Sequence, residues 1–190
     1  MKLADHAIVL DRSLMLTPRN PGDALEMFTI IDTDRELLRE WLSWVDATHS
    51  VADTRRYAQF AERQFQQRSL FDYSIRHEGS IVGSIGLHNV DWTMRNAHIG
   101  YWLRPNVRGR GLVTRASAAL TTLAFEQFGL HRLEIRCVTE NTLSRAVPSR
   151  LGYHLEGVLS EAYLLHGRFR DIALYAMTAG EWGPPPPSPL

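Results

Sequence analysis

The chain has 190 residues, a length that predicts a single domain with one hydrophobic core. Lysine plus arginine and aspartate plus glutamate each number 21, so the formal net charge is zero. This balance argues against a protein that binds nucleic acid or a membrane surface, so neither is expected as a partner.

The cysteine and histidine content argues against disulfides and metal sites. Cys137 is the single cysteine, and its apolar neighbours indicate a buried thiol. The histidines do not stand in metal-ligand spacings, so we expect no metal. Residues 1–16 lack the pattern of a signal peptide, and no segment approaches membrane-spanning length. We therefore expect a protein of the reducing cytoplasm.

The N-terminal third predicts one strand and two helices. Leu14–Thr17 is a short strand candidate closed by Pro18. Apolar residues at three- and four-residue spacings predict one helix over Asp23–Trp44. A second helix is expected over Asp53–Gln67, with Ser50 in the position of a capping box. Its apolar stripe consists of Tyr57, Phe60, Ala61 and Phe65.

The middle of the chain predicts strands that lead into a long helix. Phe71–Arg76 and Ile81–Leu87 flank the sequence HEGS, which is typical of a hairpin turn. Ala97–Leu103 is the next strand. A loop with two glycines then precedes a helix over Leu112–Phe128, which Gly129 should end.

The C-terminal part predicts three more strands and a short helix. The sequence RLEIRCV is a strand, and Asn141–Leu151 is a helix that contains Pro148. Strands Val158–Leu165 and Phe169–Met177 flank the sequence HGR. The fold class is therefore α/β (α+β), with a mostly antiparallel sheet. We assign residues 1–178 to the domain and residues 179–190 to a proline-rich tail, expected to be disordered and solvated.

The sequence RPNVRGRGLVTR joins a strand to a helix and is suited to an anion. Backbone N–H groups and the positive helix end favour phosphate at such a point. A Walker A loop is excluded because Leu112 and Val113 follow Gly111 in place of lysine and serine or threonine. A dinucleotide loop is disfavoured because Thr114 occupies the position of its third glycine. The alternative is that this segment is an ordinary turn between a strand and a helix, with no ligand.

This loop resembles the acyl-coenzyme A loop of the GNAT acyltransferase superfamily, Gln/Arg-x-x-Gly-x-Gly/Ala. Gly109 and Gly111 match the pattern, whereas Asn106 stands where the family usually has glutamine or arginine. The sequences AHIGYWL, NTLSRAVPSRLGYHLEG and LHGRFRDIALYAM follow the order seen in the branch that acetylates the N-termini of ribosomal proteins. LLREWLSWV resembles the early helix of that branch. The resemblance covers residues 12 to 178.

The resemblance implies a GNAT fold with splayed strands, acyl-coenzyme A (most simply acetyl-CoA) as cosubstrate, and a primary amine as acceptor. It also implies a homodimer. The pyrophosphate would be held by the backbone of Arg108, Gly109, Arg110, Gly111, Leu112 and Val113. The pantetheine arm would pair with Tyr101, Trp102 and Leu103 and pass Asn141, with Ser144 close to the sulfur. Asn141 alternatively serves as a helix cap, and Ser144 as a hydroxyl exposed to solvent.

The general base is where the sequence departs from the resembled pattern. Many superfamily members have glutamate at the position of His98, and the ribosomal branch often has glutamate at the position of Tyr163. Histidine titrates in the useful range, so His98 is our first candidate, acting directly or through a water. A histidine that is merely hydrogen-bonded within the sheet is the alternative. Tyr163 could donate a proton or bind substrate, and Glu161, two residues away, is the second candidate base.

The absence of a clear carboxylate base favours an α-amine acceptor. At pH 7 about 10% of α-amines are neutral, against roughly 0.04% of lysine side chains. Deprotonation therefore costs about 1 kcal/mol for an α-amine and more than about 4 kcal/mol for lysine. Small-molecule amines, a succinyl donor and a non-catalytic acyl-CoA-binding module stay open as alternatives. Trp41, Trp44 and Trp92 could line an aromatic rim of the acceptor site, although Trp41 is more suited to the core.

Overall fold

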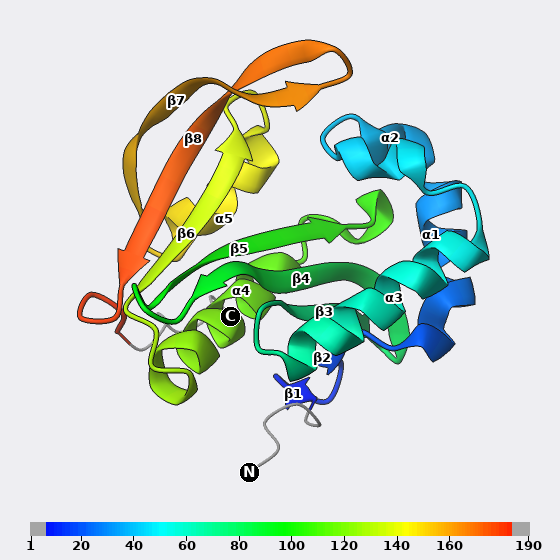
Figure 1. The fold of residues 1–190 in the computed structure, drawn as a ribbon, viewed down its shortest axis with the longest axis horizontal. Helices are drawn as coiled ribbons and strands as arrows, with labels where there is room; N and C mark the ends of the chain where they lie inside the picture. Colours follow the sequence, from blue (N-terminus) through cyan, green and yellow to red (C-terminus); the bar gives the residue numbers. More distant parts are fainter. Residues whose placement is uncertain (1–6, 184–190) are drawn as a thin grey trace.

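The structure is a computed structural model that describes residues 7–183. Its centre is an eight-stranded sheet in the order β1-β2-β3-β4-β5-β6-β8-β7 (Figure 1). Among the described strands, β5 and β6 form the one parallel pair, which confirms the mostly antiparallel sheet. The strands are β1 (Ile8–Val9), β2 (Leu14–Pro18), β3 (Phe71–His77), β4 (Ser80–Asp91), β5 (Asn96–Leu103), β6 (Arg132–Val138), β7 (His154–Leu165) and β8 (Arg168–Thr178).

The parallel strands β5 and β6 run side by side only over their first halves. Their last pair joins Ile99 to Ile135. Beyond this pair, β5 continues along β4 to Leu103, while β6 continues along β8 to Val138. The two strands diverge visibly in Figure 1. Residues 100–103 therefore have no strand partner on the β6 side, and the expectation of splayed strands is confirmed.

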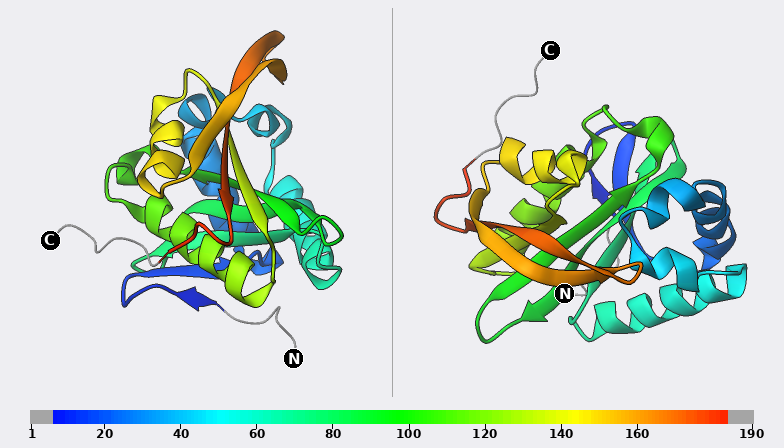
Figure 2. Two further views of the ribbon diagram at one scale, coloured as in Figure 1. Left: turned by 90° about the vertical axis from the view of Figure 1, so that its left-hand side faces the viewer. Right: turned by 90° about the horizontal axis from the view of Figure 1, so that it is seen from above.

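Helices cover both faces of the sheet (Figure 2). α1 (Ala24–Thr33), α2 (Arg35–Arg39) and α3 (Val51–Gln66) lie over one face, and α4 (Leu112–Thr122) and α5 (Thr142–Arg150) over the other. Short 3-10 turns occur at Pro21–Asp23, Ser43–Ala47 and Pro105–Val107, and a π-helical turn at Leu123–Gln127 extends α4. None of the helices in the described range is both long and apolar enough to cross a bilayer. The expected proline-rich tail lies mostly outside the described residues.

The single helix expected over residues 23–44 is wrong. The chain forms α1, α2 and a 3-10 turn, with Asp34 between the two helices. The carboxylate of Asp34 accepts a hydrogen bond from Arg104 Nε at 2.8 Å, so the break places this group in a tertiary ion pair. The apolar periodicity continues across the break because both segments bury side chains in one cluster. This cluster comprises Met27, Ile30, Ile31, Leu38, Val45 and Ile81.

The expected cap of α3 is present, but its expected apolar stripe is partly wrong. The backbone N–H of Asp53 donates to Ser50 Oγ at 3.3 Å. Tyr57 and Phe60 are 44% and 43% exposed, because the helix turns smaller side chains towards α1. Thr54 Oγ1 donates to the Ala24 carbonyl oxygen of α1 at 2.9 Å, which requires a close approach of the two helices. The buried face of α3 consists of Thr54, Ala58, Ala61 and Phe65.

The main core lies between the sheet and α4. Leu120 of α4 is fully buried there, whereas Leu25 of α1 is 64% exposed. Leu120→Ala should lower the free energy of unfolding by about 3 kcal/mol, since it removes buried methyl groups and leaves a cavity. Leu25→Ala, the same change on an exposed helix position, should change it by less than about 0.5 kcal/mol. Urea denaturation followed by circular dichroism measures both, and equal effects would contradict this assignment of the core.

Candidate active site

A cavity of 630 Å³ lies between the diverging halves of β5 and β6. It extends to side chains of α1, α3 and β7, so it reaches from the centre of the sheet to the helices over one face. From the predicted site, the lining includes Tyr101, Trp102, Asn141, Ser144 and Tyr163. Leu103, His98, Glu161 and the predicted pyrophosphate loop lie outside the lining.

The α5 wall of the cavity is organised around Ser144. Asn141 caps α5, its side-chain oxygen accepting from the Ser144 N–H at 3.0 Å. Pro148 has no N–H to donate to the Ser144 carbonyl one turn earlier, and that carbonyl accepts from Tyr101 Oη at 2.8 Å. Ser144 Oγ lies 3.2 Å from Cys137 Sγ and 3.5 Å from Tyr101 Oη. Three polar side-chain atoms of different elements thus meet at one point of the cavity.

Cys137 is buried, as expected, and it lies beside Ser144, one of the predicted catalytic residues. Alternation correctly turns Leu133, Ile135 and Cys137 to one face of β6. That face meets α5 where β6 leaves β5, which brings the thiol to Ser144. Burial raises the pKa of the Cys137 thiol and raises that of Tyr101 well above its ordinary value. Both groups are therefore neutral at pH 7.

The floor of the cavity carries a buried ion pair that the sequence analysis missed. Arg19 Nε lies 3.1 Å from Asp72 Oδ2, and these residues are only 8% and 2% exposed. The Arg19 guanidinium also donates to Ser74 at 3.2 Å and to Ser84 at 2.6 Å. Ser84 in turn donates to Asp72 at 2.9 Å. The available signal was alternation of polar with apolar residues in FDYSIRH and SIVGSIGLH, which marks one polar face of β3 and β4.

His98 is part of a hydrogen-bonded network on the surface of the sheet. Its Nδ1 lies 3.2 Å from Asn89 Nδ2, and its Nε2 lies 3.3 Å from Glu134 Oε2. Burial, aided by the charge of Arg136, lowers the pKa of His98. The imidazole is thus neutral at pH 7, but both nitrogens already have partners. The histidine that lines the cavity is its cross-strand neighbour, His88.

The two candidates on β7 lie at an irregularity of the strand. The register between β7 and β8 shifts between Leu159 and Tyr163, and Glu161 has a positive φ of 50°. Simple alternation therefore does not apply to Glu161 and Tyr163. Tyr163 lines the cavity, whereas Glu161 is exposed and its backbone N–H donates to Asp171 Oδ1 at 2.8 Å.

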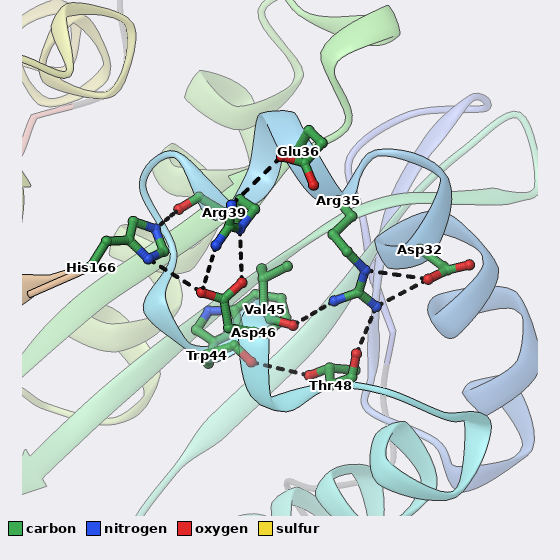
Figure 3. Close-up of polar contacts among 9 residues, drawn as sticks. All are labelled: Asp32, Arg35, Glu36, Arg39, Trp44, Val45, Asp46, Thr48 and His166. Atoms are coloured by element: carbon green, nitrogen blue, oxygen red, sulfur yellow. Dashed lines mark hydrogen bonds and ion pairs between the residues drawn. The ribbon is translucent and has the colours of Figure 1, made fainter.

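The hairpin of β7 and β8 reaches across to the segment after α2 (Figure 3). The His166 ring lies 2.6 Å from the Arg39 carbonyl oxygen through Nε2 and 3.2 Å from Asp46 Oδ2 through Nδ1. Arg39 Nε itself donates to Asp46 Oδ1 at 2.8 Å. Close by, Tyr163 Oη lies 3.0 Å from Ser43 Oγ. We name this set of contacts, from His166 and Tyr163 to Arg39, Ser43 and Asp46, the hairpin roof.

The turn under the hairpin roof is fixed by one arginine. Arg35 donates to the Val45 carbonyl oxygen at 2.8 Å and to that of Thr48 at 2.7 Å (Figure 3). This turn carries Trp44, which lines the cavity and packs against Trp102 with ring centroids 6.0 Å apart. The expected position of Trp44 at the rim is therefore consistent with the structure.

The other two tryptophans do not lie where we expected them. Trp41 lines the cavity and is half-buried, because α2 ends at Arg39 and Trp41 lies in the turn that follows it. Trp92 lies away from the cavity: its Nε1 donates to the Arg68 carbonyl oxygen at 2.8 Å, and its ring packs edge-on against Phe71 and Phe128. The short β4–β5 connection lies beside Arg68, which follows α3, and this places Trp92 away from the cavity.

The glycine loop before α4 has the geometry of an open turn. Gly109 and Gly111 have φ of +80° and +71°, and a Cβ at either position would meet no atom within 4 Å. Arg108 and Arg110 are exposed. Two further arginines that flank this loop form ion pairs, Arg104 with Asp34 and Arg115 with Asp11. Within the described range, no group of three or more His, Cys, Asp or Glu residues is placed to hold a metal ion.

Comparisons with known proteins agree with this geometry. Residues 13–154 match the family model described as Acetyltransferase (GNAT) domain. The putative ribosomal N-acetyltransferase YdaF of Bacillus subtilis is 34% identical over 164 residues, 85% of this chain and 89% of the relative. The ribosomal-protein-serine acetyltransferase of Escherichia coli is 29% identical over 89% of this chain and 94% of its own. The structure of Mycobacterium smegmatis RimJ in complex with CoA-disulfide superposes with a TM-score of 0.88, at 28% identity, covering 97% and 92% of the two chains.

The hairpin roof yields a prediction about local motion. His166→Ala removes the contacts with Arg39 and Asp46, so amide hydrogen exchange should accelerate several-fold at residues 160–167 while the melting temperature stays within a few degrees. His154→Ala, at the exposed start of the same strand, is the matched control and should leave exchange at 160–167 unchanged. Exchange measured by mass spectrometry decides; unchanged protection in His166→Ala would show that these contacts do not hold the roof.

Proposed function

The chain belongs to the GNAT acetyltransferase family and is an N-acetyltransferase, and from this premise we propose that it acetylates the N-terminal α-amine of a protein. The acyl group comes from acetyl-coenzyme A and passes to the amine by direct attack within a ternary complex. The observation that carries the proposal is the cavity at the point where β5 leaves β6, with Ser144 in its wall. A protein of the ribosome is the acceptor class that the names of YdaF and of the E. coli relative support.

The donor fits the open edge of β5. Residues 100–103 lack a strand partner towards β6, so an extended amide-containing arm can pair with them as a strand would. The pyrophosphate fits the loop 108–113, where glycines at positive φ leave open space and Arg108 and Arg110 are exposed. The N-terminus of α4 adds a favourable dipole to this anion site. The complex of RimJ with CoA-disulfide supports the same ligand.

Ser144 is suited to stabilise the leaving group. The amine nitrogen attacks the thioester carbonyl carbon, a C–N bond forms, and the C–S bond breaks with its electron pair going to sulfur. Ser144 Oγ, held by its place in the first turn of α5, donates a hydrogen bond to that sulfur, and water supplies the proton. The neutral Cys137 and Tyr101 beside it keep the pocket free of competing charge. No covalent acyl-enzyme is part of the proposal.

The charges in the cavity favour an α-amine over a lysine side chain. Each lining carboxylate already pairs with an arginine: Asp23 with Arg76, Asp53 with Arg56 and Asp72 with Arg19. A carboxylate neutralised in this way is a weak base. A lysine acceptor would have to lose its proton at a cost of more than about 4 kcal/mol at pH 7, against about 1 kcal/mol for an α-amine. The homodimer implied by the resemblance stays a prediction, which sedimentation equilibrium checks.

An acceptor screen tests the proposed function. With acetyl-coenzyme A, peptides that have a free N-terminal serine or alanine should release free thiol at least tenfold faster than the same peptides with a blocked N-terminus and an internal lysine. Polyamines, amino sugars and succinyl-coenzyme A serve as the competing arms. Ligand binding without thiol release from any amine would contradict the proposal. Faster thiol release with a polyamine, an amino sugar or succinyl-coenzyme A would assign the enzyme to that substrate class instead.

Ser144→Ala tests the leaving-group role. The variant should lower kcat about 10- to 100-fold, because one hydrogen bond to the developing thiolate is lost, while the Kd for coenzyme A changes less than about threefold. Ser149→Ala is the matched control, since Ser149 is an exposed serine later in the same helix. Steady-state kinetics and calorimetry measure the two quantities. Full activity in Ser144→Ala would remove this residue from the mechanism.

A further inference from the structure

His88 lies across the floor of the cavity on two glycines. It lies near the end of β4 and pairs with His98, and the next cross-strand pair on the same face of the sheet is Gly86 with Gly100. A Cβ placed at either glycine would come within 3.2 Å of His88 Nε2. At Gly100, the atoms within 4 Å of that Cβ that belong to other described residues are those of the His88 imidazole. The imidazole of His88 therefore packs over Gly86 and Gly100.

This position coincides with the point where β5 leaves β6. The last residue of β5 paired with β6 is Ile99, so Gly100 is the first residue of the open edge. His88, Gly100 and Ser144 all line the same cavity. A thioester that enters along the open edge thus reaches a cavity whose lining includes both the imidazole of His88 and the hydroxyl of Ser144.

The two histidines of this cross-strand pair differ in what their nitrogens contact. His98 has Asn89 and Glu134 as partners and lies outside the cavity lining. Among the described residues, no hydrogen bond or ion pair engages the ring of His88. Its nitrogens are thus available to a ligand in the cavity.

The surroundings of His88 favour the neutral ring. Burial lowers its pKa, and the negative charge of Asp72 on β3 opposes this effect. The Asp72 charge is itself offset by Arg19 at 3.1 Å. The other ionisable groups of the lining near this end are Tyr57 on α3 and Arg136 on β6, and His98 faces His88 from β5. Above pH 6.5 the imidazole is therefore neutral and able to accept a proton.

We propose that His88, and not His98, is the group that accepts the proton of the acceptor amine. The proposal rests on the proposed function. The neutral amine attacks the thioester carbonyl carbon, and the nitrogen, which becomes positively charged as the C–N bond forms, gives one proton to the free ring nitrogen of His88. The C–S bond then breaks, sulfur leaves with the electron pair, and water protonates the thiolate beside Ser144. His88 returns its proton to water, so one amine and one thioester yield one amide and one thiol.

His88→Gln is the first test, with acetyl-coenzyme A and a peptide bearing a free N-terminal serine as probes. The variant should lower kcat about 100-fold, with the KM for acetyl-coenzyme A within about threefold of the wild type. The wild-type kcat should fall as pH drops below 6.5, and this limb should be absent from the variant; the α-amine titrates higher, near pH 8. His154→Gln, an exposed histidine on β7, is the control. If His98→Gln abolishes the limb and His88→Gln keeps it, the proposal is overturned.

Gly100→Ala is the second test, because its new methyl group would contact only the imidazole of His88. The variant should lower kcat about tenfold in the wild-type background and have no further effect in the His88→Ala background. An equal loss in both backgrounds would mean that the methyl group obstructs the substrates directly, and would count against the proposal.

The outcomes separate this inference from the function on which it rests. A wild-type protein that releases thiol from acetyl-coenzyme A, combined with His88→Gln at full activity, overturns the role of His88 alone. If the wild-type protein releases no thiol with any of the tested amines, both the role of His88 and the proposed function are overturned. Circular dichroism and coenzyme A calorimetry verify that each variant is folded and binds the donor.

Discussion

The separation of β5 from β6 after Ile99 is the constraint on which the rest of the structure depends. Each strand keeps its outer partner, β4 for β5 and β8 for β6, so the sheet divides into two halves that share only a short parallel ladder. α5 packs against α4, β6 and β7, beside the gap. Unpaired backbone groups inside a protein are costly unless a partner is supplied, and here the partner has to come from outside the chain. The unpaired backbone of residues 100–103 can therefore serve as a binding surface.

The chemistry of the cavity depends on the two faces of the central strands. One face of β3, β4 and β5 packs apolar side chains against α4. The opposite face carries Asp72, Ser84 and His88, and it is only partly covered because α1 and α3 lie to one side. Burial of Arg19 with Asp72 keeps this floor polar without leaving a net charge. A neutral polar floor suits an acceptor that must lose a proton, since it stabilises neither the ammonium form nor a competing anion.

The sequence predicted the order of the elements, the strand–loop–helix motif and the wall of α5, because each depends on local patterns. The helix-capping pattern identified Asn141 as a cap, whereas the family resemblance drew attention to Asn141 and Ser144 as site residues, and both line the cavity. It could not reveal the break at Asp34 or the position of Trp92, since both follow from tertiary contacts with Arg104 and Arg68. Simple alternation did not place Glu161 correctly, because β7 is irregular at this residue.

The histidines show the same limit more sharply. The resemblance drew attention to His98 because of its place in a motif, and the strand pattern alone could not distinguish it from His88. The distinction comes from what lies opposite and beside each ring: Asn89 and Glu134 for one, and two glycines at the cavity for the other. Such information belongs to the sheet register and not to any single strand.

Pro148 shows how an interruption within one element can serve two others. The hydrogen bond that this proline cannot make leaves the Ser144 carbonyl to the hydroxyl of Tyr101, a residue of the other half of the sheet. A side chain of β5 is thereby anchored to the main chain of α5 across the gap between the halves. This bond of 2.8 Å joins the two halves where Ser144 lies, and the contacts of the hairpin roof join them again at Arg39 and Asp46. A donor that enters the gap therefore meets two halves of the sheet that are already joined, at Tyr101 and at the hairpin roof.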